Sequence, residues 1–206
     1  NSGSYKWFED KYPNNAIARA KMGALLETPN FYPYLNAVEN LEIIAHIKRV
    51  KSSNIDQLLE MVNLAHRKHS KFKTYSLGMK QRLAIAGAMI GDPEILIFDE
   101  PTNGLDPQGI AEVRETIINI AKSGKTILMA SHILDEVEKV CSHVAIIKHG
   151  KLLATGTVGS ILSDDKIIEI SSESLSSLRN VLVEMKQVHK IEENENILTL
   201  QVDKSL

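Results

Sequence analysis

The segment from Tyr75 to Asp106 constrains the fold more than any other part of the chain. Apolar residues in its first half recur at helical spacing, which predicts a helix: Met79, Leu83, Ala86 and Ile90. The sequence 91–93, Gly-Asp-Pro, should end that helix, because glycine suits the C′ position and proline cannot continue a helix. The short apolar run 95–98 then predicts a strand buried on both faces, as found in parallel sheets. The segment therefore predicts an α/β fold.

Two adjacent carboxylates, Asp99 and Glu100, follow this predicted strand directly. In open α/β sheets ligands bind at the carboxyl ends of the strands, so the pair marks a candidate site. Neighbouring carboxylates oppose each other's ionisation unless a cation lies nearby, and Mg²⁺ could supply that cation. The structural alternative is an ordinary Asp-Glu-Pro turn at the end of a strand.

The order of the motifs in this region resembles that of the ATP-binding subunits of ABC transporters. Residues 75–79, Tyr-Ser-Leu-Gly-Met, take the place of the family's signature loop, which is usually Leu-Ser-Gly-Gly-Gln. Residues 95–100 match the Walker B strand, residues 104–106 the D-loop, and Ser131-His132 the switch histidine. The resemblance implies a P-loop NTPase-like three-layer fold with a parallel sheet and a helical subdomain at about residues 34–90.

The resemblance also implies roles for residues that follow the strands. Glu100 would be the general base that polarises the attacking water, and Asp99 would help to hold Mg²⁺. His132 would contact the γ-phosphate of ATP. Glu27, where the family usually has Gln, would reach the metal and the water. These assignments require that the predicted strands ending at Glu27, Glu100 and Ala130 open on one common cleft.

Two helix starts are further candidate sites. Ser76 and Gly78 open the signature helix, where N–H groups and the helix dipole favour an anion. The resemblance implies that they close on ATP held by the opposite subunit of a dimer. Asp106, followed by Pro107, should cap the next helix, and the resemblance adds a contact across the dimer interface. A cap alone would also explain Ser76 and Asp106, and the binding role adds to it.

No phosphate-binding loop of the form G-x-x-x-x-G-K-[ST] occurs in the 206 residues. In the ABC family this loop precedes the part that is matched here, and the sequence opens at Asn1-Ser2-Gly3 without a methionine. We therefore expect an N-terminally incomplete ATPase domain that is inactive alone. The alternative is a naturally degenerate subunit.

Local patterns predict the other elements of an ATPase domain spanning residues 1–162. Residues 22–27 should form a short strand, and 126–130 a second buried strand. Residues 36–50 predict an amphipathic helix that begins with a capping box of Asn36 and Glu39, and Asn54 with Gln57 repeats this start signal. A helix at 107–122 should turn four residues inward: Ile110, Val113, Ile117 and Ala121.

The pattern changes at Ser163, which predicts a separate C-terminal extension over residues 163–206. A strand at 166–171, a helix at 175–185 and a hairpin of 188–192 with 197–202 give an α+β unit. The turn of the hairpin should lie at Asn194-Glu195-Asn196. The unit resembles the extension of many drug-export ATPases.

Composition narrows the classes of function. The net charge of −2 gives no electrostatic case for nucleic-acid binding, so the basic run 66–73 is read as a solvated face rather than a phosphate or RNA contact. The single cysteine, Cys141, excludes an intramolecular disulfide. No apolar run approaches the ~18 residues that a membrane span needs. We expect a cytoplasmic protein that meets the inner face of the membrane only through a partner.

The leading hypothesis is an ATP- and Mg²⁺-binding subunit that energises an ABC exporter through a separate membrane subunit, as a homo- or heterodimer. Glu27 with the Pro-x-Phe-Tyr run at 29–32 resembles the branch that exports antibiotics, including bacitracin-resistance and lantibiotic-immunity proteins. The aromatic residues at 31, 32 and 34 either fill the core or contact that partner. Two alternatives stay open: a non-catalytic partner that lends its signature loop, and a soluble ABC-type ATPase not linked to transport.

Overall fold

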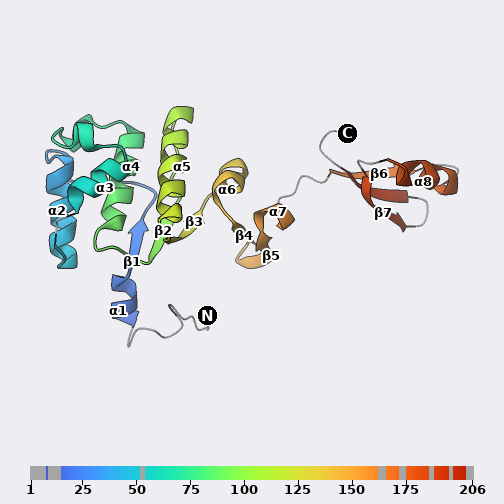
Figure 1. The fold of residues 1–206 in the computed structure, drawn as a ribbon, viewed down its shortest axis with the longest axis horizontal. Coiled ribbons are helices and arrows are strands. Elements are labelled where there is room, and N and C mark those ends of the chain that lie inside the picture. The colour runs from blue at the N-terminus through green and yellow to red at the C-terminus, as the bar shows by residue number, and fades with distance from the viewer. Residues whose placement is uncertain are drawn as a thin grey trace. The chain divides into compact units, whose positions relative to one another are not determined.

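A computed structural model describes residue 8 and residues 15–51, 54–161, 166–171, 175–185, 188–194 and 197–202 (Figure 1). The start of the sequence at Asn1-Ser2-Gly3 lies outside these residues. The chain divides into two compact units, residues 1–140 and 141–206. The boundary at residue 162 between an ATPase domain and its extension stays a prediction.

Three parallel strands form the sheet of the first unit, in the order β1-β2-β3: Met22–Leu25, Ile95–Asp99 and Thr126–Ala130. The register pairs Leu25 with Phe98 and Asp99 with Ala130. The carboxyl ends of all three strands therefore lie along one edge of the sheet. This arrangement confirms the expected α/β class and brings the three strand ends to one edge, although β1 stops two residues before Glu27. The expected common cleft at this edge stays a prediction.

The strands β2 and β3 are not buried on both faces as the sequence predicted. Leu96 and Phe98 of β2 are fully buried, in one core cluster with residues of the helices α4 (Leu77–Met89) and α5 (Pro107–Lys122). Ile95 and Ile97, on the opposite face, keep partial exposure, and β3 alternates between exposed and half-buried positions. An apolar run in the sequence predicts a strand, but which faces of that strand are buried depends on the elements that pack against it.

Gly23 fixes how closely α4 approaches the sheet. A Cβ atom at this position would lie 2.2 Å from the carbonyl oxygen of Ala88 and 2.9 Å from its carbonyl carbon. Both atoms belong to the backbone of α4, so they cannot move aside as a side chain could. A strand residue without a side chain thus lets the signature helix lie directly against β1.

The remaining helices of the first unit are α1 (Asn15–Ala20), α2 (Ala37–Lys48), α3 (Ile55–Met61) and α6 (Leu134–Val140), with short 3₁₀ turns η2 (Ala65–Arg67) and η3 (Phe72–Thr74). The helices α2, α3 and α4 gather beside β1 (Figure 1).

The predicted caps are confirmed at α2 and not at α3. The backbone N–H of Glu39 donates to Asn36 Oδ1 at 3.0 Å, and the N–H of Asn36 donates to Glu39 Oε2 at 2.7 Å, which completes the capping box. Asn54 precedes α3 but makes no side-chain cap bond. Its backbone, at φ −108° and ψ 8°, lacks the extended geometry that a capping side chain requires.

The second unit begins with an antiparallel pair, β4 (His143–Lys148) and β5 (Lys151–Thr157), followed by α7 (Val158–Ile161). His149 and Gly150 join the two strands, both with positive φ, as a type I′ hairpin turn requires.

A three-stranded antiparallel sheet in the order β6-β8-β7 follows, from Lys166–Ser171, Ile197–Val202 and Val188–Asn194, together with α8 (Leu175–Val183). Leu182, Leu198 and Leu200 form its own small core. The strands, helix and hairpin predicted after residue 163 are all present, with α8 two residues shorter and β7 two residues longer than expected. Ser163 and the turn residues Glu195 and Asn196 lie outside the described residues.

Candidate nucleotide site

The two residues predicted to act in catalysis lie in contact at the shared end of β2 and β3. The N–H of Glu100 donates to the carbonyl oxygen of Ala130 at 3.0 Å, which joins the two strand ends. His132 Nδ1 lies 2.8 Å from Glu100 Oε2. Glu100 has a left-handed backbone, at φ +48°, which is uncommon for any residue other than glycine. Asp99 is exposed beside it, as the last residue of β2.

Glu27 joins this edge of the sheet from the loop that follows β1. The side-chain amide of Asn103 donates to Glu27 Oε1 at 2.8 Å. Gln81 Nε2, from α4, donates to the backbone carbonyl oxygens of Glu27 at 3.3 Å and Pro101 at 3.1 Å. The loops after β1 and β2 are therefore tied to each other and to the signature helix.

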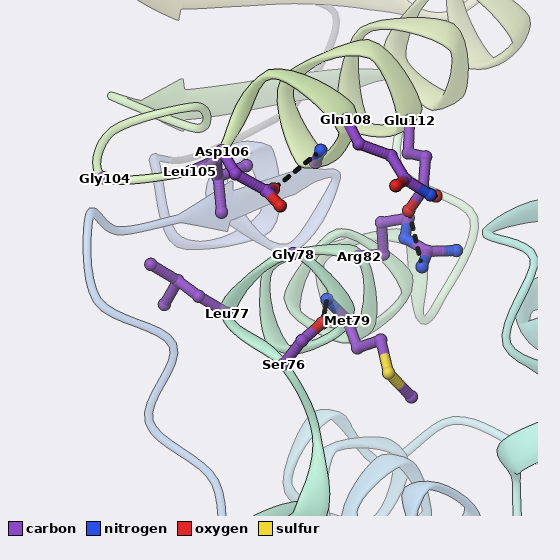
Figure 2. A pocket seen from close by; sticks show the side chains of 11 residues that line it. Ser76, Leu77, Gly78, Met79, Arg82, Gly104, Leu105, Asp106, Gln108 and Glu112 are labelled. Atoms are coloured by element: carbon purple, nitrogen blue, oxygen red, sulfur yellow. Dashed lines mark hydrogen bonds and ion pairs between the residues drawn. The ribbon is translucent and has the colours of Figure 1, made fainter.

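A pocket of about 480 Å³ lies against the starts of both α4 and α5 (Figure 2). The signature loop lines one side and residues 104–106 of the D-loop line the other. Ser76 Oγ accepts from the N–H of Met79 at 3.2 Å, and Asp106 Oδ1 accepts from the N–H of Gly109 at 2.9 Å. Both predicted caps are thus present as hydrogen bonds, and both helix starts face the same hollow.

Gly78 brings these two helix starts together. A Cβ atom on Gly78 would lie 3.4 Å from the Cα atom of Gly109, so the backbones of α4 and α5 approach closely here. Tyr75, one turn earlier, is buried and donates its hydroxyl to the carbonyl oxygen of Arg67 at 2.8 Å. Burial raises the pKa of the Tyr75 phenol, which keeps it a neutral donor. The signature loop is therefore held by packing and by hydrogen bonds.

The seven predicted site residues fall into two groups. Glu27, Asp99, Glu100 and His132 lie along the edge of the sheet, and none of them lines the pocket. Ser76, Gly78 and Asp106 all line it.

The donor set at the edge of the sheet fits a magnesium-nucleotide better than a metal held by protein alone. Across the described part of the chain, no three His, Cys, Asp or Glu side chains come close enough to form a metal site. Mg²⁺ is commonly held by one or two carboxylates, with phosphate and water oxygens completing its octahedron. Asp99 and Glu27 are exposed carboxylates, the type of side chain suited to that mode.

Three residues near the site were missed from the sequence: Gln81, Arg82 and Asn103. Arg82 is buried, and its guanidinium donates to the carbonyl oxygens of Val62 and Asn63 and pairs with Glu112 Oε2 at 2.9 Å. It thereby joins α3, α4 and α5 beneath the signature loop. For Gln81 and Arg82, the available signal was a run of three long polar residues, 80–82, inside a largely apolar helix directly after that loop.

The parallel sheet with helices packed on it, together with matches to solved structures of ABC transporter ATP-binding subunits, places the chain in the P-loop NTPase fold class. A family model described as "ABC transporter" matches residues 2–103. These residues of the chain belong to this family. Among the described residues, no helix is both long and apolar enough to cross a bilayer.

Curated relatives share long matching segments with the chain. The bacitracin transport ATP-binding protein BcrA of Bacillus licheniformis is 47% identical over 155 residues, which are 74% of this chain and 51% of BcrA. The lantibiotic transport ATP-binding protein SrtF of Streptococcus pyogenes is 44% identical over 133 residues, 65% of this chain and 58% of SrtF. The chain spans about half the length of the curated relatives it matches.

Solved structures show the same fold. The structure of cbiO1 from Clostridium perfringens, part of the ABC transporter complex cbiONQ, matches with a TM-score of 0.65 at 25% identity. The match covers 82% of this chain and 66% of cbiO1.

Proposed function

We propose that this chain belongs to the ATP-hydrolysing subunit of a bacterial ABC exporter. The observation that carries the proposal is the contact between Glu100 and His132 at the joined ends of β2 and β3. Hydrolysis of the phosphoanhydride of ATP uses a carboxylate that can accept a proton from water and an imidazole that can donate a hydrogen bond to developing charge, and both groups lie here at one place. The names of BcrA and SrtF support an antimicrobial peptide as the cargo.

The chemistry follows from these side chains. Bound Mg²⁺ would neutralise charge on the phosphate oxygens, with Asp99 and Glu27 among its ligands. Glu100 accepts a proton from the attacking water. When His132 is doubly protonated, its Nδ1–H donates to Glu100 and its Nε2–H is left to donate to a phosphate oxygen. The contact thus orients the base and the donor together.

The separation of the two residue groups supports action as a dimer. Ser76, Gly78 and Asp106 line a pocket that contains none of the residues at the edge of the sheet. In the proposed dimer each chain supplies this pocket to the nucleotide held by its partner, where N–H groups at the helix starts meet the phosphates. We place this dimer in the cytoplasm, at the inner face of the membrane.

Calorimetric titration with Mg-ATP tests the proposal. Because the 206 residues contain no phosphate-binding loop, we expect no binding at micromolar nucleotide to this chain alone. We expect micromolar binding, with release of ADP and phosphate, for the protein as its gene encodes it. An encoded protein that neither binds nor hydrolyses Mg-ATP would contradict the proposal, and micromolar binding by the chain alone would contradict the need for that loop.

An apolar groove beside the loop after β1 is the proposed docking place for the membrane subunit. The groove has a volume of about 520 Å³ and is lined mainly by apolar side chains of β1, the loop that follows it, α2 and α4. Leu26, Tyr32 and Ile47 are largely exposed there.

The predicted core role for the aromatic residues holds for Phe31, which packs on Phe72 with ring centroids 5.2 Å apart, whereas Tyr32 and Tyr34 face solvent.

The variant Ile47→Glu should reduce co-purification of the membrane subunit by about tenfold, because it places a charge in the apolar groove. Ile47 is 73% exposed, so the substitution should leave the unfolding midpoint almost unchanged. Leu134→Glu on α6, at a side chain that is 59% exposed, is the matched control. Equal co-purification of the two variants would show that the groove is not the docking place.

A further inference from the structure

Asn103 connects the loop after β2 to a residue 76 positions earlier in the chain. Its Nδ2 donates to Glu27 Oε1 at 2.8 Å. An ionised carboxylate can only accept hydrogen bonds, so the amide must present its nitrogen and not its oxygen to Glu27. The bond therefore fixes the orientation of both side chains.

Gln81 provides a second and independent link at the same place. It is 1% exposed, and its Nε2 donates to the backbone carbonyl oxygens of Glu27 and Pro101. Within the described residues, the Oε1 atom of Gln81 is buried and has no hydrogen-bond partner. A buried acceptor without a donor lowers stability, so this amide is poorly explained as a stabilising device. It is better explained by the two loops that its nitrogen holds together.

We infer that Asn103 is a positioning residue for Glu27. It holds one carboxylate oxygen and so sets the direction in which Glu27 faces the edge of the sheet. Gln81 holds the backbone of the same residue, so a shift of the loop after β2 or of the signature helix should move Glu27. The inference rests on the proposed function, because the direction of this carboxylate matters only if a magnesium-nucleotide binds beside it.

The test exchanges the hydrogen-bond donor and acceptor between Asn103 and Glu27, in the protein as its gene encodes it. Asn103→Asp alone places two carboxylates within hydrogen-bond distance, and their repulsion should turn Glu27 away. We expect kcat to fall about tenfold, equivalent to about 1.4 kcal/mol, with KM for ATP changed less than twofold. Made together with Glu27→Gln, the same substitution should change kcat less than twofold relative to Glu27→Gln alone. The new amide can then donate to the new carboxylate.

Asn119→Asp is the matched control, because Asn119 is exposed on α5 and the chemical change is identical. A purely structural role for Asn103 would lower the unfolding midpoint, and lower kcat equally, in both backgrounds. An equal loss of kcat in the two backgrounds, or no loss of kcat in either, overturns the inference. The proposed function still holds in that case, provided that the wild type is active. A wild type that fails to bind and hydrolyse Mg-ATP overturns both.

Discussion

The variant Glu100→Gln should lower ATP turnover by at least about a hundredfold, the range expected when a general base is removed. The amide has nearly the shape of the carboxylate, and its oxygen can still accept the hydrogen bond from His132 Nδ1. In the wild type this nitrogen lies 2.8 Å from Glu100 Oε2. It cannot accept a proton from the attacking water. Binding of Mg-ATP should therefore change little while kcat falls.

Phosphate release by the protein as its gene encodes it, measured beside calorimetric binding of Mg-ATP, separates these two effects. Glu115→Gln is the control, since Glu115 is exposed on α5 and away from the edge of the sheet. Turnover above one tenth of wild type in the Glu100 variant would assign the base to another residue.

The variant Arg82→Met should lower the free energy of unfolding by about 3 kcal/mol. Methionine replaces the aliphatic stem of Arg82, but the carbonyl oxygens of Val62 and Asn63 lose their donors. Each such buried group costs about 1–3 kcal/mol when it is left unpaired. Glu112 loses its ion-pair partner but keeps a hydrogen bond from Gln108 Nε2 at 3.0 Å. It is 35% exposed and contributes less, because water screens it.

Urea unfolding followed by far-UV circular dichroism measures this loss. Arg179→Met removes an arginine that is 53% exposed and 3.6 Å from Glu193, so it should change stability by less than about 0.5 kcal/mol. A loss below about 1 kcal/mol for Arg82→Met would mean that α3, α4 and α5 do not depend on this guanidinium.

Local signals in the sequence were sufficient for the elements that position the site. The cap residues Ser76 and Asp106 predicted the starts of α4 and α5, because a capping hydrogen bond spans only three residues. The helix period was less precise: Ala121 of α5 is exposed and Ile120 is buried instead. With 3.6 residues per turn, Ile117 is followed on the buried face at three residues as readily as at four.

Contacts between distant segments could not be predicted in this way. The pair of Asn103 and Glu27 joins two loops that neither periodicity nor capping relates to each other. The same holds for Gly23. That this position must lack a side chain becomes visible only when α4 packs against β1. The order of the motifs in the sequence indicated which segments form the site. Only the folded structure shows which of their side chains are in contact.

The left-handed backbone at Glu100 should lower thermal stability, while the glutamate side chain at that position is needed for turnover in the proposed mechanism. A residue with a side chain costs on the order of 1 kcal/mol in that conformation, whereas glycine adopts it freely and asparagine tolerates it. A library of variants screened only for thermal survival would therefore drift toward those two residues at position 100 and lose the carboxylate. Retention of glutamate there through such a screen would mean that this backbone conformation does not limit thermal stability.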